Sequence, residues 1–100
     1  MTMEDHELFD NKERKCYEFH IDGLIPRIDY IKAANGGVYL THTEVPYDIR
    51  GAGIAAQLTE KALKDIEWQG LKVVPMCGFV AAYIKRHPEW KRLLLEGVNV

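Results

Sequence analysis

The strongest constraint on this chain is a glycine-rich hexamer at residues 50–55, which reads Arg-Gly-Ala-Gly-Ile-Ala. It stands between a strand-like segment at residues 38–45 and a helix-like segment at residues 53–69. A glycine turn that opens a helix leaves several N–H groups unpaired, with the positive end of the helix dipole behind them. Such a turn can bind a diphosphate, and Arg50 adds a cation for the phosphate oxygens. The hexamer therefore predicts a cofactor-phosphate loop, although a helix cap that binds nothing could have the same sequence.

Three classes of phosphate loop can be compared with this hexamer. The nucleoside-triphosphate loop needs Lys and then Ser or Thr after its last glycine, and Ile54-Ala55 at that point exclude it. The dinucleotide loop has matching spacing at Gly51, Gly53 and Ala56. That loop, however, follows the first strand of a parallel sheet, with an acidic residue about 20 positions later at a strand end. Here strands precede the loop, and the acidic residues after it fall within the predicted helix. The third pattern, Arg-x-x-Gly-x-Ala, fits without these conflicts.

Composition is typical of one compact domain, with 47% hydrophobic and 28% charged residues in 100. A net charge of −2 does not favour nucleic acid or an anionic membrane as a partner. No apolar run is long enough for a bilayer, and the acidic N-terminus differs from a signal peptide. Two cysteines, Cys16 and Cys77, make no disulfide framework and indicate a reducing compartment. We therefore expect a cytoplasmic monomer or small homo-oligomer.

The order of expected elements follows from the periodicity of apolar residues. Residues 14–21, 24–33 and 38–45 read as three strands joined by tight glycine turns, which predicts an antiparallel meander. A helix over residues 53–69 follows, and a short apolar strand at residues 71–76 should lie parallel to its neighbour after this crossover. Residues beyond it are helical again up to Pro88. The predicted fold class is α/β (α+β): a three-stranded antiparallel meander, a loop, a helix, a parallel strand and a helix.

Four sequence blocks in the second half, taken together with this element order, resemble a known family. They are His42-Thr43-Glu44-Val45-Pro46, Arg50-Gly51-Ala52-Gly53, Pro75-Met76-Cys77, and Tyr83-Ile84-Lys85-Arg86-His87-Pro88-Glu89-Trp90. The chain resembles the very small single-domain branch of the GNAT superfamily of N-acetyltransferases, in which Arg-x-x-Gly-x-Ala is the pyrophosphate loop. The resemblance covers about residues 13–95 and implies one GNAT-like domain over residues 1–100.

The resemblance implies that acetyl-CoA (coenzyme A) enters an opening between the strand at residues 38–45 and the strand that ends at Met76. Its pantetheine arm would follow the first of these strands, and its pyrophosphate would bind the glycine loop. A bulge on the same strand would free an N–H group to polarise the thioester carbonyl. The cofactor contacts implied in this way are Thr43, Val45, Arg50, Gly51, Ala52, Gly53, Ile54 and Ala55.

Acyl transfer to an amine needs a base for the amine and an acid for the departing thiolate. The catalytic candidates are Cys77 and His42 first, then Glu44, and Tyr83 as an acid. If their strands lie side by side, His42 could meet Cys77 and lower the thiol pKa, which permits an acetyl-cysteine route. Each candidate also has a purely structural interpretation. The Cys77 thiol could be a buried apolar group and His42 a core histidine, while Glu44 could be a solvated carboxylate and Tyr83 a packing aromatic. No pair of His and Cys residues has metal-ligand spacing, so no metal is expected.

Two classes of function follow from the resemblance. The first is an acetyl-CoA-dependent N-acetyltransferase whose acceptor is a small amine, an exposed lysine or a protein N-terminus. The second is a non-catalytic acyl-CoA binder or an interaction module that keeps the cofactor loop. The N-terminal helices that form the acceptor side in larger relatives have no counterpart in this sequence, so that side is expected to be open.

Overall fold

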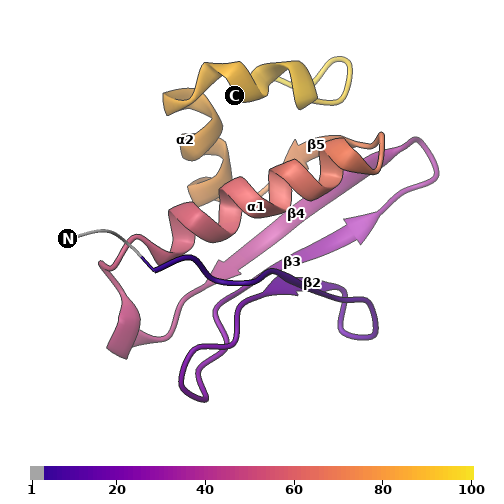
Figure 1. The fold of residues 1–100 in the computed structure, drawn as a ribbon. Coiled ribbons are helices and arrows are strands. Elements are labelled where there is room, and N and C mark those ends of the chain that lie inside the picture. Colours follow the sequence, from indigo (N-terminus) through magenta and orange to yellow (C-terminus); the bar gives the residue numbers. More distant parts are fainter. Residues whose placement is uncertain (1–3) are drawn as a thin grey trace.

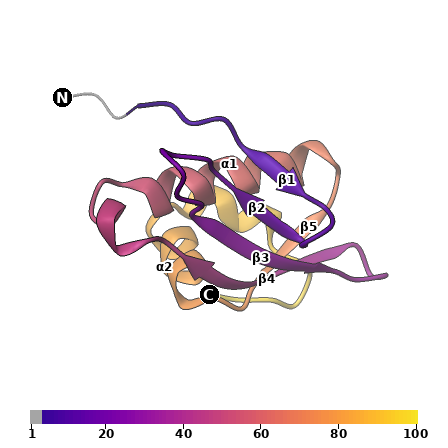
Figure 2. The same cartoon turned by 90° about the horizontal axis from the view of Figure 1, so that it is seen from below.

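The computed structural model describes residues 4–100, in which a five-stranded sheet carries its helices on one face (Figures 1 and 2). The first four strands form an antiparallel meander, and the fifth strand pairs with the fourth in parallel. In their order across the sheet they are β1 (Phe9–Asn11), β2 (Cys16–Glu18), β3 (Arg27–Lys32), β4 (Gly37–Glu44) and β5 (Lys72–Pro75). The helices are α1 (Ile54–Trp68) and α2 (Gly78–Arg86), with short 3₁₀ turns η1 (Tyr47–Ile49) and η2 (Pro88–Leu93). The predicted element order and the parallel last strand are confirmed.

The meander has one strand more than the sequence predicted. Strand β1 pairs with β2 through three residues, from Phe9 opposite Glu18 to Asn11 opposite Cys16. Strand β2 is in turn shorter than the predicted residues 14–21, since it ends at Glu18. Beyond that point the Phe19 N–H donates to the Pro26 carbonyl at 3.1 Å. Ile21 and Leu24 form an isolated bridge around a turn, in which Asp22 adopts a positive φ of 49°.

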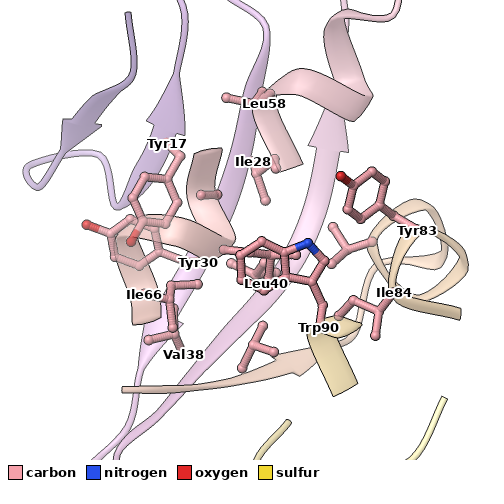
Figure 3. Packing of buried hydrophobic residues seen from close by; sticks show 14 of the residues in the cluster. Tyr17, Ile28, Tyr30, Val38, Leu40, Leu58, Ile66, Tyr83, Ile84 and Trp90 are labelled. Carbon is pink, nitrogen blue, oxygen red and sulfur yellow. The ribbon is translucent and has the colours of Figure 1, made fainter. Parts of the chain in front are cut away.

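One hydrophobic core lies between the sheet and the helices (Figure 3). Helix α1 contributes apolar residues three or four positions apart, and Leu58, Leu63 and Ile66 are completely buried. They pack on sheet residues that include Ile28 and Leu40. Full burial of each such side chain contributes roughly 1.5–3 kcal/mol, so this contact fixes α1 firmly against the sheet. The start of α1 therefore has a defined position beside the end of β4.

None of the helices formed by residues 4–100 is long and apolar enough to cross a membrane.

Candidate active site

Strands β4 and β5 part midway along β4, and this parting creates the site. Their pairing runs from Gly37 opposite Lys72 to Leu40 opposite Pro75. The N–H groups of Met76 and Cys77 then both donate to the Leu40 carbonyl, at 3.0 and 2.9 Å, and end the ladder. Strand β4 continues to Glu44 without a β5 partner. The opening implied by the resemblance is therefore present in the fold.

A cleft of about 560 Å³ occupies this opening. Its walls come from the end of β4, the loop that follows, the first turn of α1 and the start of α2. All the cofactor contacts implied by the resemblance line it except Ala52, namely Thr43, Val45, Arg50, Gly51, Gly53, Ile54 and Ala55. Ile49, Ala56 and Phe79 also line the cleft, and sequence reasoning missed them, because apolar wall residues have the same pattern as core residues.

The loop at one end of the cleft is shaped to expose backbone N–H groups. Gly51 and Gly53 have φ values of 82° and 74°, in the left-handed region that residues with a Cβ rarely adopt. Gly53 is the N-cap of α1, and no side chain caps this helix. The first-turn N–H groups of residues 54–56 have no acceptor within the helix, and all three residues line the cleft. The loop therefore fits a diphosphate.

Arg50 is held at the rim of the loop by two contacts. Its Nε donates to the Val45 carbonyl at 3.0 Å, and its Nη2 lies 3.6 Å from Glu44 Oε2. The side chain is 60% exposed, so its other N–H groups remain accessible to a phosphate.

A β-bulge in β4 decides which side chains face the cleft. Tyr30 pairs with Leu40 and Asp29 with His42, so Thr41 is an extra residue without a partner on β3. A single inserted residue moves every later side chain to the opposite face of the strand. Thr43 consequently pairs with the fully buried Ile28 on the helix-covered face, whereas His42 and Glu44 lie on the other face. Glu44 is the last residue of β4, and it also lines the edge of the cleft. The bulge that the resemblance implied on this strand is present at Thr41.

Cys77 lies at the other end of the cleft, as the N-cap of α2. Its Sγ is 3.1 Å from the Thr43 hydroxyl oxygen. Burial raises the pKa of the Cys77 thiol, but the hydrogen bond with Thr43 and the N–H groups of Val80 and Phe79 outweigh it. The net effect is a pKa below the ordinary value of 9.0. The Cys77 side chain makes no regular capping hydrogen bond to α2, but the N–H groups at the start of this helix still favour the negatively charged thiolate. Cys77 is therefore a partly accessible thiol with increased thiolate character.

The predicted pairing of His42 with Cys77 is wrong. His42 Nε2 lies 3.2 Å from Glu44 Oε1, and both side chains are about half exposed on the open face of the sheet. The hydrogen bond with His42 lowers the pKa of Glu44, and Arg27 and Arg50 act in the same direction. The bulge explains the error, because it turns His42 away from the face on which Thr43 reaches Cys77.

Tyr83 is placed away from the cleft. Its side chain is buried among the core residues (Figure 3). Its hydroxyl donates to Glu60 Oε2 on α1 at 3.4 Å. Burial, followed by the charge of Glu60, raises the pKa of Tyr83 to about 12. The ring also packs against His87, with 4.3 Å between ring centroids. In this arrangement Tyr83 links the two helices, and its hydroxyl is directed at Glu60 rather than at the thiol end of the cleft.

A family model described as GCN5-related N-acetyltransferase matches residues 16–93. The chain belongs to this acetyltransferase family. Protein NATD1 of Xenopus tropicalis is 30% identical over 80 residues, which are 78% of this chain and 73% of that protein. Protein NATD1 of Gallus gallus is 41% identical over 80 residues, with the same shares covered. A GCN5-like protein of Staphylococcus aureus, solved by NMR, superimposes with a TM-score of 0.69 over 93% of this chain and 91% of that one. Its sequence is 19% identical, so it supports the acetyltransferase fold.

Within residues 4–100, no group of three or more His, Cys, Asp or Glu side chains is arranged to hold a metal ion.

The two cysteines of this acetyltransferase should differ strongly in reactivity. Iodoacetamide is expected to alkylate Cys77 with a pH midpoint below 9.0, because its thiolate is stabilised. Cys16 should stay unmodified in the folded protein, because burial and then the hydrogen bond to Glu18 raise its pKa to about 11. Thr43→Val removes a bond that favours the thiolate, so the Cys77 midpoint should rise. Peptide mass spectrometry across a pH series measures both sites, and identical Cys77 midpoints in wild type and Thr43→Val would contradict the geometry.

Proposed function

We propose that this chain is an acetyl-CoA-dependent N-acetyltransferase that passes the acetyl group to an amine by way of Cys77. The observation that carries the proposal is a single cleft with a diphosphate-shaped glycine loop at one end and a thiol of lowered pKa at the other. Membership of the acetyltransferase family supports the reaction class.

The residues that would bind the cofactor divide into two groups. The N–H groups of residues 51–55 and the guanidinium of Arg50 would bind the diphosphate. The edge of β4 after Leu40 lacks a strand partner, so its backbone can pair with the amides of the pantetheine arm as a further strand would. Acetyl-CoA, when bound, supplies a thioester whose carbonyl carbon accepts a nucleophile. The bulge at Thr41 interrupts the ladder close to that carbonyl's expected path, and a backbone N–H there would polarise it.

The covalent route assigns separate tasks to the two faces of β4. On the cleft face, the Cys77 thiolate forms a bond to the acetyl carbon while the bond between that carbon and the coenzyme sulfur breaks. The departing thiolate takes a proton from water. The amine nitrogen then bonds to the acetyl carbon, the bond to Cys77 breaks, and Glu44, directly or through His42, accepts the proton that the amine loses. Thr43 thus takes the thiol-activating role that the sequence had suggested for His42.

Intact-protein mass spectrometry after mixing with acetyl-CoA tests this function. Wild type and the matched control Cys16→Ala should each gain one acetyl group, whereas Cys77→Ala should gain none, because Cys16 is buried with a raised thiol pKa. Native spectra of Cys77→Ala should still show bound cofactor.

The other outcomes separate the alternatives. Bound cofactor without an acetyl adduct on wild type would exclude the Cys77 route. Release of coenzyme A in the presence of amines would then indicate direct transfer, and no release would indicate a non-catalytic acyl-CoA binder. Failure to bind the cofactor at all would mean that the cleft has another ligand.

A further inference from the structure

A second cavity, of about 640 Å³, lies on the sheet face that the helices leave open. Figure 2 views the sheet from this open face, with the helices behind it. Residues of β1, β2 and β3 and of their connecting turns line it. The charged residues in its wall are two arginines and two acidic residues: Arg14, Arg27, Glu18 and Asp29. Neither the cofactor nor the acyl-transfer steps proposed above use this cavity.

The acidic groups of the cavity already have donors. Glu18 has a side chain only 9% exposed, and its carboxylate accepts from His20 at 2.8 Å, from Asn11 at 3.3 Å and from the Cys16 thiol at 3.4 Å. Asp29 Oδ1 accepts from Arg27 Nε at 2.9 Å. The carboxylates are therefore largely committed to partners within the protein.

The two arginine side chains of the cavity have hydrogen-bond donors that no group in the described part of the chain accepts. Arg27 uses its Nε for Asp29, which leaves both terminal nitrogens of its guanidinium for another acceptor. Arg14 is exposed, and within residues 4–100 its guanidinium has no hydrogen bond or ion pair; only its backbone N–H is bound, to Asn11. A planar guanidinium matches a carboxylate or phosphate, to which it can donate two parallel hydrogen bonds. The unused hydrogen-bonding capacity of this cavity thus favours an anion.

The cavity adjoins the active site through the register of the sheet. Directly opposed residues point to the same face, and one row runs from Glu18 through Arg27 to Glu44. A second row runs from Cys16 through Asp29 to His42. Neighbouring strands lie about 5 Å apart, so Arg27 is one strand away from the carboxylate that faces the amine. Glu44 lines the cofactor cleft and is paired with Arg27 of the second cavity, so neighbouring residues at the end of β4 line the two cavities.

We propose that this open-face cavity binds the anionic end of the acceptor, so that the substrate is a small primary amine bearing a carboxylate or phosphate group. The anion pairs with Arg14 and Arg27, and the amine reaches Glu44 and His42 on the next strand. The proposal rests on the acetyltransferase function above and specifies its substrate class. It also gives the open face a role that needs no further helices.

Acetylation rates for a matched set of amines test the proposal. The probes are 4-aminobutyrate, 3-aminopropylphosphonate and n-butylamine, which has the alkyl chain without the anion. We expect the two anionic amines to be used with a kcat/KM roughly 10- to 100-fold above that of n-butylamine, the ratio that a charge-assisted bond provides. Comparison of carboxylate with phosphonate identifies the preferred anion.

Variants of the two arginines test whether the preference for anionic amines arises from this cavity. Arg14→Glu and Arg27→Gln should each raise KM for the anionic amines by roughly 10-fold or more. Arg14, unlike Arg27, is not among the charges that shift the pKa of Glu44, so Arg14→Glu should leave n-butylamine turnover and coenzyme A affinity little changed. The matched control is Arg86→Ala, an exposed arginine at the end of α2. Equal use of n-butylamine, or an unchanged KM in both variants, would overturn the acceptor proposal while leaving the acetyltransferase function intact.

Failure of the acetyltransferase function itself would be recognised separately, by the absence of cofactor binding and of acetyl transfer to any amine. In that case calorimetric titration of the chain with 4-aminobutyrate decides the cavity's role. Binding that Arg14→Glu weakens would support the anion site, and no binding to wild type would overturn it.

Discussion

Gly53→Asp is expected to reduce the affinity for coenzyme A by roughly 100-fold or more, because it places a carboxylate where the diphosphate would bind the start of α1. The new carboxylate would compete for the first-turn N–H groups and repel the phosphates. The backbone adds a smaller cost, since Gly53 has a φ of 74° and a residue with a Cβ loses about 1–2 kcal/mol there. Calorimetric titration with coenzyme A measures the affinity.

Two matched variants separate charge from backbone strain. Gly53→Ala carries the strain without the carboxylate. Gly70→Ala carries similar strain at the opposite end of α1, where φ is 75° and an added Cβ would contact nothing within 4 Å. Gly70→Ala should lower thermal stability slightly and bind coenzyme A normally. If Gly53→Asp also bound coenzyme A normally while folded, the loop would not be a diphosphate site.

The sequence predicted the parts of the fold that depend on local periodicity. The spacing of Leu58, Ala62 and Ile66 identified α1, and the glycines on either side of it located its ends. Strand β1 was not predicted, because three residues are too few to show an alternation of apolar and polar positions. Its pairing with β2 depends on tertiary contacts rather than on local sequence.

The error in the site arose from one residue. An uninterrupted strand puts His42 on the face of Val38 and Leu40, and there it would have been near Cys77. The unpaired Thr41 reverses the faces beyond it, so Thr43 takes that position. A single sequence contains no signal for such an insertion, since Thr is a good strand residue whether or not it is paired. The family resemblance implied a bulge on this strand but did not say which residue forms it.

Tyr83 and the second cavity illustrate a different limit. Tyr83 lies on the apolar side of a helix, and the sequence could not reveal that its hydroxyl would be directed at Glu60, 23 residues earlier. The cavity collects residues from three strands and their turns, so no short motif marks it. Both depend on which strands and helices become neighbours, which local pattern does not determine.

Deletion of Thr41 is expected to lower the acetyl-transfer rate by roughly 100- to 1000-fold, the cost of losing an oxyanion donor, without unfolding the chain. The deletion leaves Tyr30 paired with Leu40 and Asp29 with His42, now as consecutive pairs of a regular ladder. Because those pairs keep their faces, Thr43 should still reach Cys77. Only the interruption of the ladder, with its free backbone groups, is removed.

Thr41→Ala is the matched control, since it removes only the hydroxyl bond to the Asp29 carbonyl, at 3.4 Å, and retains the bulge. It should keep most of the activity. Coenzyme A affinity, thermal unfolding and the pH midpoint of Cys77 alkylation should be similar in wild type and both variants, which would assign the lost rate to the bulge rather than to binding or to the thiol. A deletion variant that transferred acetyl groups at the wild-type rate would show that the bulge serves only to orient side chains, and the polarising group would then have to come from the start of α2.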